Sequence, residues 1–78
     1  MTAWTVYTRA GCSLCEQLID DLARVLESSQ AQVAVIDITD DAGLEAKYGR
    51  RIPVLLADGE FVCAYHLDEQ RVRAHLSD

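Results

Sequence analysis

The feature that most restricts the fold of this chain is a pair of strand-like runs with one helical run between them. Residues 3–8 (AWTVYT) and 32–38 (QVAVIDI) are rich in β-branched and aromatic residues, as buried strands are. Residues 13–27 place apolar side chains at helical spacing. A strand–helix–strand unit forces its two strands to run parallel in one sheet. Because the apolar residues of 32–38 are nearly continuous, we expect that strand to be central and covered on both faces.

The second half of the chain predicts a short helix followed by a hairpin. One of the residues 39–41 caps the short helix, which runs to Tyr48. Residues 53–57 and 60–64 are predicted strands, and the Asp58-Gly59 dipeptide between them is a strong signal for a two-residue turn. Such a turn makes these two strands antiparallel, so the predicted sheet is mixed and has four strands.

The predicted order is βαβ, then α, then two strands, then α, an α/β arrangement whose mixed sheet is flanked by helices. Asp68 caps the last helix, over residues 69–76. The chain has 78 residues, which is room for a single domain, residues 1–78, with a small core. One Trp and one Phe are available to anchor that core.

The charge balance excludes some classes of partner. Thirteen acidic residues against seven basic ones give a net charge of −6, which disfavours binding to nucleic acid or to an anionic membrane surface. No run approaches the ~18 apolar residues of a membrane span, and the first residues do not resemble a signal peptide. We expect a soluble, cytoplasmic monomer.

Cys12 and Cys15, in the stretch AGCSLC, are the residues most indicative of chemistry. Cysteines three positions apart at a helix start lie on one face, close enough for a disulfide. A redox couple, half of a metal site and a structural disulfide all fit this spacing. A structural disulfide is the weaker explanation, because so short a loop yields little stabilisation by chain entropy and cytosolic disulfides rarely persist.

The position of Cys12 favours the redox couple. A thiol with the ordinary pKa of about 8.5 is only slightly ionised at pH 7. The helix dipole stabilises a thiolate there by about one pKa unit, and the free N–H groups of the first turn, together with Arg9 if it folds back, would add to this effect. We therefore predict that Cys12 is the nucleophile and that Cys15, one turn into the apolar face, is the resolving thiol.

A metal site is the main chemical alternative. Cys63 and His66 form a second C-x-x-H spacing, so Cys12, Cys15, Cys63 and His66 are a formal zinc ligand set. Residues 16–62 separate the two pairs, however, which is far more chain than compact zinc motifs contain. The alternative explanation for Cys63 is a small buried strand residue.

Two longer stretches, VYTRAGCSLC and RRIPVLLADGEFV, resemble a glutaredoxin-like member of the thioredoxin superfamily. The resemblance covers nearly the whole chain and implies the thioredoxin fold. It implies a cis Ile52-Pro53 bond facing the cysteines, with the Ile52 backbone pairing with substrate. Arg9, Arg50 and Arg51 would then bind substrate carboxylates, and Asp68 would meet the amino group of glutathione.

The resemblance implies a thiol-disulfide oxidoreductase that acts on protein disulfides or small thiols. We expect no permanently bound cofactor, with glutathione as a candidate co-substrate. Glutaredoxins carry two glycines where this chain has Cys63-Ala64 followed by Tyr65 and His66, which predicts weak glutathione binding. The alternatives that stay open are a metal- or iron-sulfur-binding protein and a non-catalytic thioredoxin-fold binding module.

Overall fold

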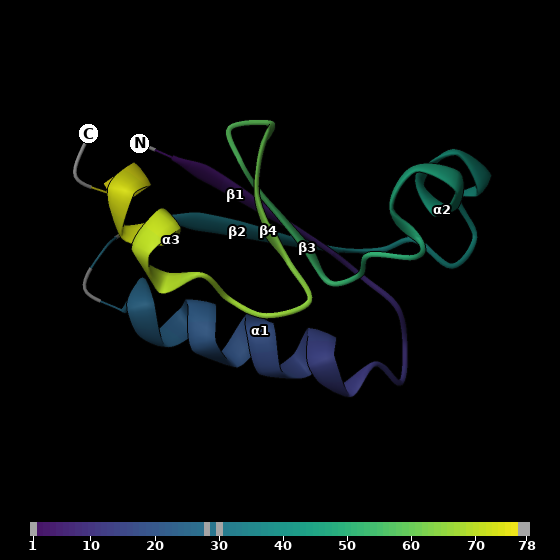
Figure 1. Cartoon of the computed structure of the whole chain (residues 1–78), viewed down its shortest axis with the longest axis horizontal. Helices are drawn as coiled ribbons and strands as arrows, with labels where there is room; N and C mark the ends of the chain where they lie inside the picture. The colour runs from purple at the N-terminus through teal and green to yellow at the C-terminus, as the bar shows by residue number, and fades with distance from the viewer. Residues whose placement is uncertain (1, 28, 30, 77–78) are drawn as a thin grey trace.

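The computed structural model describes residues 2–27, 29 and 31–76, and its elements follow the predicted order (Figure 1). In chain order they are β1 (Ala3–Thr8), α1 (Ser13–Val25), β2 (Gln32–Asp37), α2 (Ala42–Tyr48), β3 (Val54–Ala57), β4 (Glu60–Ala64) and α3 (Glu69–Leu76). None of the helices in this part of the chain is long and apolar enough to cross a membrane.

The strands form one mixed sheet in the order β2-β1-β3-β4. β1 runs parallel to β2 and antiparallel to β3, and β3 pairs antiparallel with β4. The turn between β3 and β4 has positive φ at both central residues, 50° at Asp58 and 85° at Gly59, as a type I′ turn requires. The predicted mixed, four-stranded sheet is therefore confirmed.

Three predicted boundaries differ from the structure by one or two residues. α1 ends at Val25 rather than at residue 27, because its last turn tightens and the Glu27 N–H donates to the Arg24 carbonyl. β3 begins at Val54, since Pro53 has no N–H to offer the sheet. β2 ends one residue early, at Asp37.

The prediction that the second strand is central was wrong. β2 lies at an edge of the sheet, and all six of its residues are exposed. β1 takes the central place because β3 pairs with its free edge, with Tyr7 opposite Val54. An apolar run indicates a strand, but it does not show whether that strand will pair with a neighbour on both sides or on one side only.

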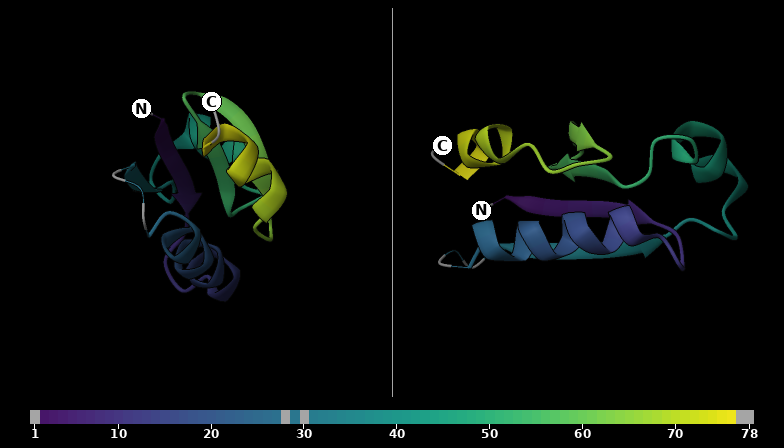
Figure 2. Two further views of the ribbon diagram at one scale, coloured as in Figure 1. Left: turned by 90° about the vertical axis from the view of Figure 1, so that its left-hand side faces the viewer. Right: turned by 60° about the horizontal axis from the view of Figure 1, so that its bottom comes forward.

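The core lies between the sheet and the pair of helices α1 and α3, which pack next to each other in Figure 2. Trp4 of β1 is fully buried there, as predicted. Phe61 does not anchor the core and is 52% exposed. Its neighbour Val62 points into the core, so the alternation of a strand turns Phe61 to the opposite face.

α2 lies beyond one end of the sheet and has no buried residue (Figure 1). Its Tyr48 ring stacks on Tyr7 of β1, with ring centroids 4.8 Å apart. Asp41 is the cap that the structure selects, because its carboxylate accepts the Leu44 N–H at 3.0 Å. The start of α1, the end of β1 and the start of β3 also lie at this end of the sheet.

Candidate functional site

A tight turn delivers Cys12 from the end of β1 to the start of α1. The Cys12 N–H donates to the Arg9 carbonyl at 3.3 Å, which closes a four-residue turn. Gly11 occupies its third position with φ of +75°, the left-handed value that a type II turn needs. A Cβ at Gly11 would meet no atom within 4 Å, so the backbone conformation, not crowding, requires glycine here.

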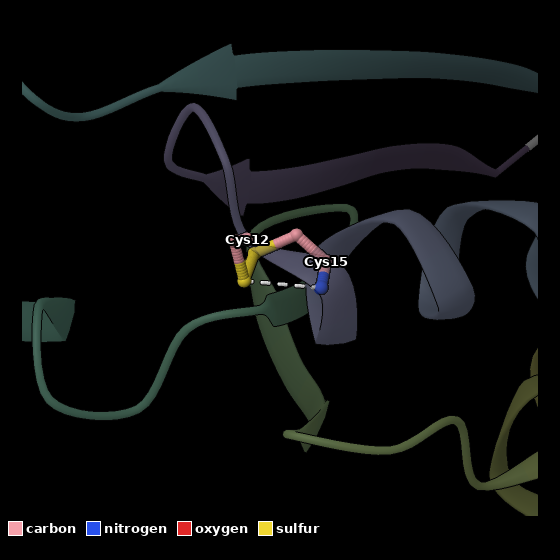
Figure 3. Close-up of a disulfide and its surroundings, with 2 residues drawn as sticks. All are labelled: Cys12 and Cys15. Carbon is pink, nitrogen blue, oxygen red and sulfur yellow. Dashed lines mark hydrogen bonds between the residues drawn. A yellow bond between two sulfur atoms is a disulfide. The ribbon is translucent and has the colours of Figure 1, made fainter.

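Cys12 is the N-cap of α1. Its backbone is extended, and its Sγ accepts the Cys15 N–H at 3.1 Å (Figure 3). The Cys12 carbonyl accepts the Glu16 N–H, the first hydrogen bond of the helix. A thiolate at Cys12 would thus receive one of the N–H groups that a helix start leaves without a partner.

Cys15 lies one turn further and faces the core. The Cα atoms of Cys12 and Cys15 are 5.2 Å apart, within the range of a disulfide, and Figure 3 draws their bond. Cys15 is 1% exposed, whereas Cys12 is partly exposed. A substrate from solvent can therefore reach Cys12 before it reaches Cys15.

The segment that leads into β3 passes this pair. Tyr7 lies opposite Val54 in antiparallel strands, so the residues after Tyr7 and those before Val54 continue past the same end of the sheet. The Ile52–Pro53 peptide bond is cis, and Pro53 is buried. The Pro53 carbonyl accepts the Tyr65 N–H at 2.9 Å. The residue that follows β4 is therefore bonded to the segment that leads into β3.

The three arginines predicted to bind substrate have different surroundings. The Arg9 guanidinium forms an ion pair with Glu45 of α2. Arg50 and Arg51 are exposed, and neither forms an ion pair with another residue of the described chain. The Arg50 carbonyl accepts the Tyr65 hydroxyl at 2.9 Å.

Asp68 caps α3. Its Oδ1 accepts the Arg71 N–H at 3.2 Å, and its Oδ2 lies 3.4 Å from the Arg71 Nε. The carboxylate is thus already used within the chain, as the helix-cap prediction requires.

The third cysteine lies inside the fold. Cys63 is 6% exposed, and burial is the largest effect on its thiol, whose pKa it raises. Within the described residues no three His, Cys, Asp or Glu side chains gather as a metal site. The four residues of the formal zinc set, Cys12, Cys15, Cys63 and His66, are therefore not brought together.

Sequence reasoning missed Asp37 and Glu45. Hydrogen bonds from Thr39 are the main reason that the Asp37 pKa is lowered, and a hydrogen bond from the Ala10 backbone and the charge of Arg9 lower it further. Asp37, at the end of β2, therefore lies near the turn that carries Cys12. A signal was present, because this carboxylate interrupts an apolar strand at its carboxyl end.

The fold and the cysteine pair define a class, the thioredoxin-fold proteins with a CxxC at the start of the first helix. A thioredoxin from Halobacterium salinarum is 28% identical, with a TM-score of 0.61 over 97% of this chain and 72% of that one. The profile of the family described as Glutaredoxin-like domain (DUF836) matches residues 4–77. The chain therefore belongs to the glutaredoxin-like domain family.

Two further proteins are similar to this chain. Protein Ne2328 from Nitrosomonas europaea, solved by NMR, is 34% identical with a TM-score of 0.85, over 95% of this chain and 89% of that one. The "uncharacterized protein Rv0508" of Mycobacterium tuberculosis is 35% identical over 75 residues, 90% of this chain and 77% of that protein. Neither name states an activity.

Proposed function

We propose that this protein is a thiol-disulfide oxidoreductase with a dithiol mechanism, in which Cys12 is the nucleophile and Cys15 the resolving thiol. The observation that carries the proposal is the hydrogen bond from the Cys15 N–H to the Cys12 Sγ at the start of α1. That N–H and the positive end of the helix both favour the thiolate over the thiol. Burial of Cys15 supports the order of attack.

The reaction begins when the Cys12 thiolate attacks one sulfur of a substrate disulfide. The substrate S–S bond breaks, the first substrate thiolate leaves, and a mixed disulfide joins Cys12 to the other half. Cys15 then loses its proton and attacks the Cys12 Sγ, which releases the second substrate thiolate and leaves the Cys12–Cys15 disulfide. Two electrons pass to the substrate; one product thiolate takes the proton that Cys15 gives up, and the other takes a proton from solvent. An external thiol, supplied as a dithiol or as two monothiols, returns the protein to its reduced form.

Substrate binding is proposed for the segment before β3. Ile52 lies just before β3, whose start pairs with the end of β1 that leads to the turn of Cys12, so its backbone would pair with an extended chain that carries the disulfide. Arg50 and Arg51 are exposed and free of carboxylate partners within the described chain, so they are the cations available to an anionic substrate. Asp68 serves mainly as a helix cap, so its contact with a substrate amino group is the least supported part of this site.

We propose protein disulfides and small-molecule thiols as the partners, with glutathione as a weakly bound co-substrate and no resident cofactor. A dithiol centre of this kind needs a reducing environment to be recycled, which favours the cytoplasm. The protein would act as a monomer.

The test is a single-turnover reaction of the pre-reduced protein with a disulfide-bonded protein substrate. One substrate disulfide should be reduced for each protein molecule, with loss of two protein thiols and formation of the Cys12–Cys15 disulfide. Failure to reduce any protein or small-molecule disulfide would favour a non-catalytic binding module instead.

A further inference from the structure

The Arg9 side chain, three residues before Cys12, is held by α2. Its guanidinium pairs with the Glu45 carboxylate, and the two side chains are only 38% and 33% exposed. A Cβ at Gly49 would overlap the Glu45 carboxylate and lie 3.3 Å from the Arg9 Nη2. The absence of a side chain at Gly49 therefore leaves the space in which this ion pair forms.

A second carboxylate, that of Asp37, is also influenced by the charge of Arg9. The charge of Arg9 is one of the smaller influences that lower the Asp37 pKa, after the hydrogen bonds from Thr39 and the Ala10 backbone. Arg9 thus lies in the field of two carboxylates, from β2 and from α2. Its charge is compensated within the chain, unlike the charges of Arg50 and Arg51.

The position of Arg9 makes this compensation relevant to substrate choice. Its carbonyl closes the turn that presents Cys12, and its guanidinium lies against Gly49, where the segment leading to Pro53 begins. An anionic disulfide that approaches Cys12 must compete with Glu45 for this cation. Glu45 is tethered nearby, so it competes at a high effective concentration.

We propose that Glu45 is a specificity-determining residue, which withholds the Arg9 guanidinium from anionic disulfides and so biases the protein toward uncharged ones. This inference rests on the proposed dithiol reaction and adds a rule for its substrates. Glu45 acts through Arg9 and does not touch the reacting sulfurs.

The test compares two disulfides of similar size in single turnovers of the pre-reduced protein, anionic 3,3′-dithiodipropionate and neutral 2-hydroxyethyl disulfide. In each reaction the protein dithiol becomes the Cys12–Cys15 disulfide and the substrate becomes two thiols. The readout is the ratio of the two second-order rate constants, anionic over neutral. Glu45→Gln keeps the length of the side chain and removes its charge, and it should raise this ratio about two- to fivefold at low salt, as expected for one partly exposed charge contact.

Two controls separate charge release from a general change at α2. The double variant Glu45→Gln with Arg9→Gln should lose the gain, because the released cation is gone. Glu60→Gln makes the same chemical change in an exposed residue of the distant hairpin and should leave the ratio unaltered. The gain should also vanish at about 0.5 M salt, where exposed charges are screened.

Each outcome has one meaning. A ratio unchanged in Glu45→Gln, or a gain that persists without Arg9, would overturn the inference while the dithiol reaction stands. If neither disulfide is reduced by the unmodified protein, the proposed function itself is wrong. If Glu45→Gln does not fold, which circular dichroism would reveal, the same ratio is measured for Glu45→Ala. A raised ratio then supports the inference, and an unchanged ratio overturns it.

Discussion

The Cys15 N–H donates to the Cys12 Sγ over 3.1 Å, so each cysteine of the pair affects the other in both oxidation states. In the oxidised protein the two residues are joined by the disulfide. In the reduced protein the same amide would stabilise the Cys12 thiolate, because hydrogen bonds to a charged acceptor are the stronger ones. In the proposed reaction, the first helical turn would therefore both hold the disulfide and activate the nucleophile.

The first prediction is that Cys12 reacts first when the reduced protein is alkylated. The positive end of the helix and the free N–H groups of its first turn should lower its pKa below the ordinary value of a cysteine thiol. Iodoacetamide at pH 6 to 7, followed by mass spectrometry of peptides, should show Cys12 modified well before Cys15 and Cys63. Faster modification of Cys63 in this range would mean that the nucleophile is wrongly assigned.

The second prediction concerns the separate roles of the three cysteines in turnover. Cys12→Ser should lower disulfide reduction by about 10³-fold or more, since the attacking sulfur is lost. Cys15→Ser should instead accumulate a mixed disulfide at Cys12, visible as an added substrate mass under non-reducing conditions. Cys63→Ala, a change of a buried thiol outside the pair, is the matched control and should retain turnover.

The third prediction is that Cys63 is inert in the folded protein. Burial raises the pKa of its thiol, so little thiolate is present at pH 7 and a reagent cannot reach it. Alkylation of Cys63 should follow the unfolding curve as urea is added, whereas alkylation of Cys12 should precede it. Equal rates for the two thiols in the absence of urea would contradict the buried position of Cys63.

The parts of the site that sequence could predict are the local ones. Cys12 was predicted at the helix start, because a helix start depends on residues adjacent in the chain. Partners from distant segments were not predictable. Arg9 was expected to bind substrate, yet its partner Glu45 comes from α2, whose place beyond the sheet no local pattern specifies.

The distinction between local and long-range features also explains the errors in the predicted fold. The residues of β2 and β4 carry correct strand signals, and the hairpin was predicted from its Asp58-Gly59 turn. The exposed state of β2 and of Phe61 depends instead on which strand pairs with which, and on which face the helices cover. These are properties of the whole sheet.

The fourth prediction is that Asp37 makes stability depend on pH in the acid range. Its pKa is lowered, first by hydrogen bonds from Thr39, so the folded protein binds the proton more weakly than the unfolded chain does. The stabilising contribution is therefore complete above the ordinary value of 3.8 and is lost as the pH falls through the lowered pKa. In urea unfolding between pH 6 and pH 2, the difference in free energy of unfolding between the natural protein and Asp37→Asn should shrink on acidification. A difference that stays constant over this range would show that the carboxylate does not contribute through its charge.

The fifth prediction concerns Tyr65, whose side chain connects the end of β4 to the segment before β3. Its hydroxyl donates to the Arg50 carbonyl at 2.9 Å. Its φ is +68°, and the His66 N–H donates to the Ala64 carbonyl at 2.8 Å, which makes Tyr65 the centre of a γ-turn of the rare, strained form. A backbone conformation that non-glycine residues rarely adopt costs about 1–3 kcal/mol. The ring therefore stays beside Arg50 at an energetic cost.

Two substitutions separate the hydrogen bond of Tyr65 from the space that its ring fills. Tyr65→Phe removes only the exposed hydrogen bond and should destabilise the protein by about 0.5 kcal/mol, with little change in a glutathione-coupled disulfide assay. Tyr65→Gly relieves the positive φ and opens the surface beside Arg50 and Arg51, so glutathione carboxylates can approach these cations. We expect its glutathione-coupled rate to rise about two- to fivefold, the gain of one exposed charged contact. An equal gain in Tyr65→Phe would assign the effect to the hydrogen bond, and no gain in Tyr65→Gly would show that the ring does not limit the use of glutathione.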